Sequence, residues 1–403
     1  MTRLLYILPG LVPPGSDSAL DKFTFLSEVA EGEVLLPVWF KSPDSVPPFL
    51  RETFPVYRRG KFFYHFFLSF QVAKPLRRLA ILLFYIRCGL QLHRKKKIDV
   101  IMTYGTNLPG IAGVILKWLT GAQLIVEIPG VPEDAFRYDV PHSGSRDRIK
   151  RLLSDRLLLL VGAAADCFKL LYPWQLQKYP RLQKKKIAVF HDFVPIHIIA
   201  SEKSEERFIL SAGYPWYRKG IDVLIRAFKL IAPGFPNYKL RLLGYYPDRE
   251  YLDKLAGGSP QIEFLKPGPY ELALKEIATC SVYALASRSE AMGRVLLEAM
   301  AARKPIIASA VSGVPYYVKD NDNGLLFESE NVEELSAKLV ALLSDSDLQD
   351  RLANCGYKKV ISEYDERSYV HSFLGMLQSL RSSSLGSHDH DEELRVAVKN
   401  AHT

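Results

Sequence analysis

The feature that most constrains the fold is the alternation of short β-rich runs with amphipathic helical patterns along most of the chain. Repeated strand, helix, strand units predict parallel sheets with helices on both faces. The expected strands are 4–8, 34–38, 100–104, 124–128 and 187–190, followed by 208–212, 239–243, 262–265, 281–286, 305–308 and 325–327. Two such series predict two doubly wound α/β domains.

The boundary between the two series is predicted near Pro195, which ends one strand and precedes the polar run 201–207. We therefore expect Rossmann-like domains at 1–195 and 196–365, and a C-terminal helix at 366–380 that crosses back to the first domain. Residues 381–403 are rich in Ser, His and Asp, which predicts a disordered tail. Because ligands of such sheets bind outside the carboxyl ends of the strands, a central cleft between the domains is the expected site.

Composition narrows the class of protein. With 48% apolar and 24% charged residues, the chain can form a sizeable core. Cys88, Cys167, Cys280 and Cys355 are scattered, which argues against a disulfide scaffold or a cysteine zinc site and favours a cytoplasmic protein. No secretory signal is expected, because the short apolar run at the start of the chain soon meets Gly10 and the Pro13-Pro14-Gly15 turn. No transmembrane helix is expected, because the apolar run at 79–86 is only eight residues long.

The positive charge is concentrated in one short segment. Residues 51–100 contain twelve Lys or Arg and two Asp or Glu, a net charge of +10 in a chain whose total is +9. Within it, residues 58–97 interleave basic and aromatic side chains, a pattern that predicts a helix pair resting on an anionic membrane surface. The alternative is that the aromatic residues belong to the core and only the charges are solvated. Nucleic acid is not expected as a partner, because no recognised binding module accompanies the charges.

The sharpest chemical signal is the segment 287–300, read as Ser-Arg-Ser-Glu-Ala-Met-Gly-Arg-Val-Leu-Leu-Glu-Ala-Met. A strand ends in a loop that carries Glu290, Gly293 allows close backbone approach, and a helix follows with Glu298 on its second turn. A helix start after a parallel strand offers free amides to a phosphate, while the two carboxylates can bind sugar hydroxyls. The plainer alternative is a surface ladder of ion pairs among Glu290, Arg294 and Glu298.

This arrangement resembles the Glu-x7-Glu signature of the retaining family 4 glycosyltransferases of GT-B fold. The segment 213–220 (Gly-Tyr-Pro-Trp-Tyr-Arg-Lys-Gly) is similar to the family's Gly-Arg-x4-Lys-Gly turn. Residues 312–315 and 323–327 resemble its Gly-Val-Pro-Glu and Asn-Gly-Leu-Leu segments. The resemblance covers residues 209–327, and residues 1–195 match only in their pattern of elements.

The resemblance implies a retaining, hexosyl-type glycosyltransferase that moves a sugar from a nucleotide-sugar donor to a hydroxyl. The acceptor would be lipid-linked or part of a polysaccharide or glycoconjugate, and residues 1–195 would form the acceptor side. Lys219 would neutralise the donor diphosphate, Glu290 would orient the sugar and Glu298 would bind the ribose. The other donor-binding residues implied are Arg218, Gly244, Met292, Gly293 and Arg294.

In the first domain, the loop with Gly15 and Ser16 follows the first strand and is a candidate loop of the cleft, although a plain turn explains it equally well. No cofactor is expected beyond the nucleotide sugar. Three Asp-x-Asp sequences, at 320–322, 345–347 and 389–391, lie outside the strand-end loops and are interpreted as turns and caps. No catalytic metal is therefore predicted.

Two alternatives stay open at this stage. Tyr214 stands where the family has an arginine, and the acceptor-side loops lack the histidine of many relatives. Both departures suit a non-catalytic GT-B subunit that binds a sugar nucleotide or acts as a scaffold. A GT-B epimerase acting on the nucleotide sugar is the second alternative.

Overall fold

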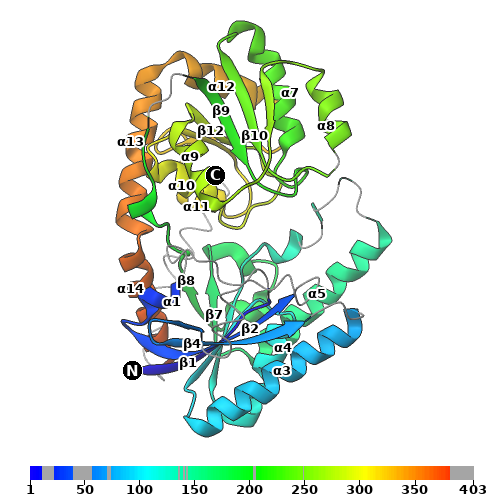
Figure 1. The fold of residues 1–403 in the computed structure, drawn as a ribbon, viewed down its shortest axis with the longest axis vertical. Coiled ribbons are helices and arrows are strands. Elements are labelled where there is room, and N and C mark those ends of the chain that lie inside the picture. The colour runs from blue at the N-terminus through cyan, green and yellow to red at the C-terminus, as the bar shows by residue number, and fades with distance from the viewer. Residues whose placement is uncertain are drawn as a thin grey trace. The chain divides into compact units, whose positions relative to one another are not determined.

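The computed structural model describes residues 1–10, 22–39, 57–69, 74–134, 137–138, 141, 144–202, 206–247 and 249–381. The chain divides into two compact units, drawn in Figure 1. Unit 1 comprises the described parts of Met1–Glu133, Arg151–His191 and Glu366–Thr403. Unit 2 comprises the described parts of Asp134–Lys150 and Asp192–Asp365. The predicted tail at 381–403 lies outside the described residues except for Arg381.

Unit 1 is built on an eight-stranded sheet, called here the first sheet, in the order β3-β4-β2-β1-β5-β6-β7-β8. Its strands are β1 (Thr2–Ile7), β2 (Ala30–Trp39), β3 (Tyr57–Arg59), β4 (Phe62–Ser69), β5 (Val100–Tyr104), β6 (Gln123–Glu127), β7 (Cys167–Leu170) and β8 (Lys186–Val189). Its helices are α1 (Lys22–Leu26), α3 (Lys74–Lys95), α4 (Leu108–Thr120), α6 (Pro180–Gln183) and α14 (Glu366–Arg381). A further helix, α5 (Ser145–Ala164), contributes its first turns to unit 2 and the rest to unit 1.

Apart from the antiparallel pair β3–β4, the strands of the first sheet pair in parallel. The strand order reverses between β1 and β5, so the loops after these strands diverge and leave room for a ligand at the carboxyl edge of the sheet. Helices α3 and α4 lie side by side in Figure 1 and pack against each other.

The segment 57–69 is a β-hairpin, and the predicted helix pair at 58–97 is therefore wrong in its first half. Phe62, Tyr64 and Phe66 alternate as buried residues along β4, which pairs with β2 inside the sheet. An alternation of period two is the pattern of a strand. It was concealed because Phe63 and Phe67, on the other face, are aromatic too. Only α3 forms a helix in this segment.

Unit 2 is built on a six-stranded parallel sheet, called here the second sheet. Its strands are β9 (Arg207–Ala212), β10 (Tyr238–Leu243), β11 (Ile262–Leu265), β12 (Val282–Leu285), β13 (Ile306–Ser309) and β14 (Leu325–Phe327). Its helices are α7 (Ile221–Ile231), α8 (Arg249–Ala256), α9 (Tyr270–Thr279), α10 (Arg294–Ala301), α11 (Val314–Tyr317), α12 (Val332–Ser344) and α13 (Ser346–Glu363).

The second sheet has the order β11-β10-β9-β12-β13-β14, which is the 3-2-1-4-5-6 order of a Rossmann fold. The buried strands carry near-continuous apolar runs, as expected for a sheet covered on both faces. Its strand order reverses between β9 and β12. The loops after these two strands are therefore the place where the fold favours ligand binding.

Candidate functional site

The loops after β9 and β12 meet at the switch point of the second sheet. The backbone N–H of Arg288 donates to the carbonyl oxygen of Arg218 at 2.8 Å. Gly220, just before α7, approaches β12 so closely that a Cβ atom there would lie 1.8 Å from the carbonyl oxygen of Ala286. These backbone contacts place residues 213–220 beside residues 287–293.

Lys219 and Glu290 form an ion pair across these two loops. Lys219 Nζ lies 2.5 Å from Glu290 Oε2, and the two side chains are 13% and 15% exposed. The Lys219 side chain runs along Gly213, where a Cβ atom would come within 2.7 Å of Lys219 Cε. Ser287 Oγ also donates to Glu290 Oε2 at 3.2 Å. A cation and a carboxylate are thereby held together with limited access to solvent.

The start of α10 lies next to this ion pair. Gly293 has a φ of +58° and its N–H points to Glu290 Oε1 at 3.3 Å. A Cβ atom on Gly293 would lie 2.7 Å from Tyr317 Oη, so only glycine fits without strain. Met292 is buried beside it. The free amides of the helix start and the Lys219 ammonium thus provide a local positive field suited to a phosphate.

Glu298 lies inside the domain rather than on a surface ladder. It is 3% exposed and accepts a hydrogen bond from Tyr270 Oη at 2.7 Å, while Arg294 Nε lies 3.1 Å from the same oxygen, Oε1. Burial raises the pKa of the Glu298 carboxyl, and Arg294 and Tyr270 oppose that rise. Because Glu290 pairs with Lys219 from another loop, the exposed three-residue ladder considered from the sequence does not form.

The remaining predicted donor residues surround the same edge of the sheet. Gly244 follows β10, and a Cβ atom there would lie 2.6 Å from the carbonyl oxygen of Gly213. Arg218 is partly buried and its Nη2 donates to the carbonyl oxygen of Tyr214 at 3.4 Å. Tyr214 is 53% exposed.

The loop after β12 is attached to α7 by a buried ion pair between Arg288 and Asp222. The sequence analysis missed this pair. Arg288 donates hydrogen bonds from Nη1 to Asp222 Oδ1 and from Nη2 to Asp222 Oδ2, each at 2.9 Å, and both residues are buried. Arg288 Nη1 also donates to the carbonyl oxygen of Tyr217 at 2.5 Å. An aspartate in the first turn of a helix ordinarily indicates a cap, so no sequence signal paired Asp222 with Arg288.

The other predicted residues either lie away from this site or fall outside the described residues. Gly15 and Ser16 fall outside the described residues. Asp345 caps α13 by accepting from Leu348 N, and Asp320 accepts from Leu326 N in a turn. The pair at 389–391 is not among the described residues. Within the described ranges, no group of three His, Cys, Asp or Glu side chains could hold a metal ion.

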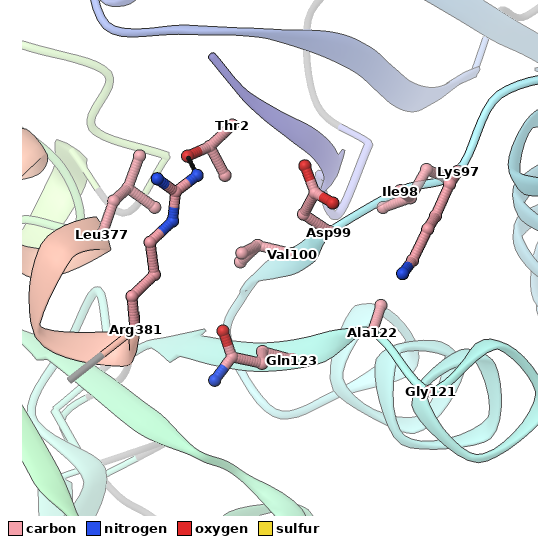
Figure 2. A pocket seen from close by; sticks show the side chains of 10 residues that line it. All are labelled: Thr2, Lys97, Ile98, Asp99, Val100, Gly121, Ala122, Gln123, Leu377 and Arg381. Atoms are coloured by element: carbon pink, nitrogen blue, oxygen red, sulfur yellow. Dashed lines mark hydrogen bonds between the residues drawn. The ribbon is translucent and has the colours of Figure 1, made fainter. Parts of the chain in front are cut away.

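A cavity of about 250 Å³ lies at the edge of the first sheet where the strands begin, which is its amino edge. Figure 2 shows Lys97, Asp99, Gln123 and Arg381 around it, with Arg381 donating to Thr2 Oγ1 at 2.7 Å. Strands β1, β5 and β6 begin here, whereas ligands of doubly wound sheets bind where the strands end. We therefore do not assign this cavity to the candidate site.

The sequence of residues 195–359 matches the family model described as Glycosyl transferases group 1. The lipopolysaccharide core biosynthesis glycosyltransferase LpsE of Rhizobium meliloti is 27% identical over 174 residues, covering 42% of this chain and 49% of that protein. A D-inositol 3-phosphate glycosyltransferase of Corynebacterium aurimucosum is 32% identical over 136 residues, covering 32% of each. The chain spans at most about half the length of these curated relatives.

Solved structures resemble almost the whole chain. Sucrose-phosphate synthase from Thermosynechococcus elongatus superposes with a TM-score of 0.76 at 17% identity, over 95% of this chain and 100% of that one. HepE from Anabaena in complex with UDP and glucose gives 0.65 at 16% identity, over 93% and 99%. The predicted fold class, two Rossmann-like α/β domains of GT-B type, is confirmed.

Proposed function

We propose that the protein is a retaining, hexosyl-type glycosyltransferase, which moves a sugar from a nucleotide-sugar donor to a hydroxyl acceptor. The observation that carries the proposal is the Lys219–Glu290 ion pair at the start of α10, at the switch point of a group 1 domain. The fold match to HepE, a protein solved with UDP and glucose, supports a sugar nucleotide as the ligand.

The charges of the site suit the departure of a diphosphate. As the bond between the sugar C1 and the diphosphate oxygen breaks, negative charge grows on that oxygen. Lys219, Arg218 and the amides at the start of α10 would stabilise this charge. In the ligand-bound state Lys219 would bind the diphosphate and release part of its contact with Glu290. Glu290 would then accept hydrogen bonds from sugar hydroxyls.

In this proposal the acceptor attacks C1 on the same face of the sugar ring from which the diphosphate leaves. The anomeric configuration of the sugar is therefore retained. The acceptor oxygen forms its bond to C1 on that face, and its proton passes to the departing diphosphate oxygen. Glu290 and Glu298 are both assigned to hydroxyl groups, on the sugar and the ribose, so neither is assigned as a nucleophile. We propose that the reaction uses no catalytic metal. The positive charges of Lys219, Arg218 and the backbone amides would stabilise the departing diphosphate instead.

The acceptor side is proposed to approach an anionic membrane, through α3 rather than through a helix pair. Leu76, Leu79 and Leu83 form one exposed stripe on this helix, and Arg87 continues it one turn later. Exposed leucines beside basic residues suit the headgroup layer, where apolar insertion and attraction to anionic lipid add together. A lipid-linked acceptor would be consistent with this surface. In the part of the chain that the structure describes, no helix is both long and apolar enough to cross a membrane.

The experiment that tests the function is a thermal-stabilisation screen of nucleotide sugars with the full chain. We expect one donor to raise the melting temperature of the wild type, and Lys219→Gln to lose most of that rise. Lys275→Gln, an exposed lysine of α9, is the matched control and should respond like the wild type. If no nucleotide sugar or nucleoside diphosphate stabilises the wild type, the proposal is wrong.

A further inference from the structure

A cluster of polar side chains occupies the carboxyl edge of the first sheet, in unit 1. Tyr104, Glu127 and Lys169 are paired across β5, β6 and β7, so they lie side by side on one face. Tyr6, from β1, reaches the same place and donates its hydroxyl proton to Glu127 Oε2. The cluster therefore stands at the switch point between β1 and β5, where a doubly wound sheet receives ligands.

The Glu127 carboxylate is already neutralised within the cluster. Lys169 Nζ lies 2.6 Å from Glu127 Oε1, and the two side chains are 0% and 1% exposed. The other oxygen, Oε2, is taken by the Tyr6 hydroxyl. A buried lysine and a buried glutamate thus balance each other in a closed pair, as buried charges must.

Lys22 adds a second cation to this neutral pair. Its Nζ donates to Tyr6 Oη at 2.8 Å and lies 3.7 Å from Glu127 Oε2. It also stands over two aromatic rings, 4.6 Å from the centre of Tyr6 and 5.7 Å from that of Tyr104. Among the described residues, Glu127 is the only carboxylate within 4 Å of Lys22, and it is already paired. The cluster of Lys22, Lys169 and Glu127 carries a net charge of +1.

The position of Lys22 is partly open. Its side chain is 14% exposed, whereas those of Lys169 and Glu127 are buried. Tyr6 donates its only hydroxyl proton to Glu127, so in its contact with Lys22 the Tyr6 oxygen is the acceptor. This hydrogen bond sets the orientation of the Lys22 ammonium. An ammonium has three protons, so Lys22 retains donors for a ligand that arrives from the open side.

We propose that Lys22 is a binding residue for an oxyanion, a phosphate or carboxylate group, on the ligand that unit 1 receives. Lys22 has little contact with solvent, and the one carboxylate near it among the described residues, Glu127, is already paired with Lys169. An anion that replaces the lost water would therefore stabilise this cation. If the proposed glycosyltransferase function holds, that ligand is the acceptor. The acceptor class would then be hydroxyl compounds that also carry an anionic group. The identity of the anion as part of an acceptor rests on that function, but the oxyanion site itself does not.

The test uses the full chain with inorganic phosphate and, separately, acetate as probes, at constant ionic strength maintained with chloride. All variants carry Lys219→Gln, so that the diphosphate site of unit 2 does not contribute. We expect at least one probe to raise the melting temperature of this parent. Adding Lys22→Gln should raise the probe concentration needed for the same shift about tenfold or more, since a hydrogen bond to a charged group contributes about 1.5 to 3 kcal/mol.

Two further variants make the result specific. Lys22→Arg keeps the charge and should stay within about threefold of the parent, because a direct electrostatic contact survives. Lys97→Gln removes an exposed lysine at the cavity of Figure 2, on the other edge of the same sheet, and should respond like the parent. A parent that neither probe stabilises overturns the inference. The inference is also overturned if Lys97→Gln removes the probe-induced rise in melting temperature and Lys22→Gln leaves it unchanged.

These outcomes are separable from those of the proposed function. If the wild type is an active transferase but neither probe stabilises the Lys219→Gln parent, the oxyanion site alone is contradicted. A Lys22-dependent shift in a protein that binds no nucleotide sugar would contradict the proposed function alone. In a working transfer assay, Lys22→Gln should raise the KM for an anionic acceptor and leave the KM for the donor unchanged.

Discussion

At the scale of single residues, the two carboxylates of the segment 287–300 experience different surroundings. Glu290 is partly exposed and contacts Lys219, while Glu298 is buried and contacts Tyr270 and Arg294. A carboxylate near solvent and a flexible lysine can exchange partners when a ligand arrives. A buried carboxylate held on a helix is better suited to fix one rigid group of that ligand.

We therefore expect different losses from the two alanine substitutions. Glu290→Ala should abolish transfer and leave the affinity for nucleoside diphosphate within about threefold, since its proposed partners are on the sugar. Glu298→Ala should weaken nucleotide binding by about 1 to 3 kcal/mol, through loss of a charge-assisted hydrogen bond. Calorimetric titration of both variants measures this. Equal losses, or no loss in either, would contradict the division of roles.

The raised pKa of Glu298 predicts a pH dependence of stability. Burial favours the protonated carboxyl in the folded protein, so folding raises the pKa above its ordinary value of 4.5. The stabilising contribution of the protonated form is present below pH 4.5 and is lost as the pH rises through the raised pKa. The unfolding free energy of the wild type minus that of Glu298→Gln should fall over this interval.

Urea unfolding of the wild type and Glu298→Gln between pH 4 and 8 checks this sign. Because Gln does not titrate, the variant removes the contribution of this group and leaves the others. A difference that stays constant, or increases with pH, would show that burial does not raise the pKa of Glu298.

Sequence reasoning about single residues succeeded where a short motif kept its partners close in the chain. The placement of Glu290, Gly293 and Glu298 on a loop and the helix after it followed from the order of residues. The Lys219–Glu290 and Asp222–Arg288 pairs join residues more than 60 positions apart. Such pairs depend on the strand order of the second sheet, which the spacing of residues along the chain does not encode.

At the scale of elements, the site depends on the close approach of the loop before α7 to the end of β12. Gly220 has a φ of +61° and leaves no room for a Cβ atom beside Ala286. We expect Gly220→Ala to destabilise the protein by about 2 kcal/mol or more, because both strain and a backbone clash must be relieved. Chemical denaturation measures the loss.

Gly234 provides the matched control for this substitution. It follows α7, and a Cβ atom there would meet nothing within 4 Å. Gly234→Ala should change the unfolding free energy by less than about 1 kcal/mol. Similar losses in the two variants would mean that the contact between the loop before α7 and β12 is not tightly packed.

The helix α3 carries the second prediction at this scale. Arg87→Glu with Arg94→Glu, both exposed on the stripe of Leu76, Leu79 and Leu83, should release the full chain from vesicles of anionic lipid, since each basic residue near the surface contributes about 1 kcal/mol. High salt should act in the same direction. Lys254→Glu with Lys275→Glu, exposed in unit 2, is the control for net charge. A wild type that ignores anionic vesicles at low salt would contradict the membrane proposal.

Several strands were predictable as short β-rich runs with distinct flanks. The expected strands 100–104, 262–265 and 325–327 have the observed bounds, since each is a compact run between polar flanks. Strand β7 was missed because Lys169 breaks its apolar pattern, and only the buried pairing with Glu127 makes that lysine acceptable. Strand β4 was missed because aromatic residues occupy both of its faces, Phe63 and Phe67 as well as the buried positions, so its period-two pattern was hidden.

At the scale of the whole molecule, the alternation of strands and helices was sufficient to predict two doubly wound sheets. It did not predict their strand orders, which decide where each sheet has its switch point. Those orders give each unit its own carboxyl edge, with Lys219 and Glu290 in unit 2 and the cluster around Lys22 in unit 1. We propose on this basis that unit 2 binds the donor and unit 1 binds the acceptor, each at the carboxyl edge of its own sheet.

The most direct test of the central proposal is a proton NMR time course of the full chain with the donor that the thermal screen identifies, in excess chelator. The spectrum follows the anomeric proton of the transferred sugar, or of the sugar first released when water is the acceptor. The account predicts turnover without added metal and an initial product with the anomeric configuration of the donor. An inverted product, or turnover that appears only when magnesium or manganese is restored, would contradict it.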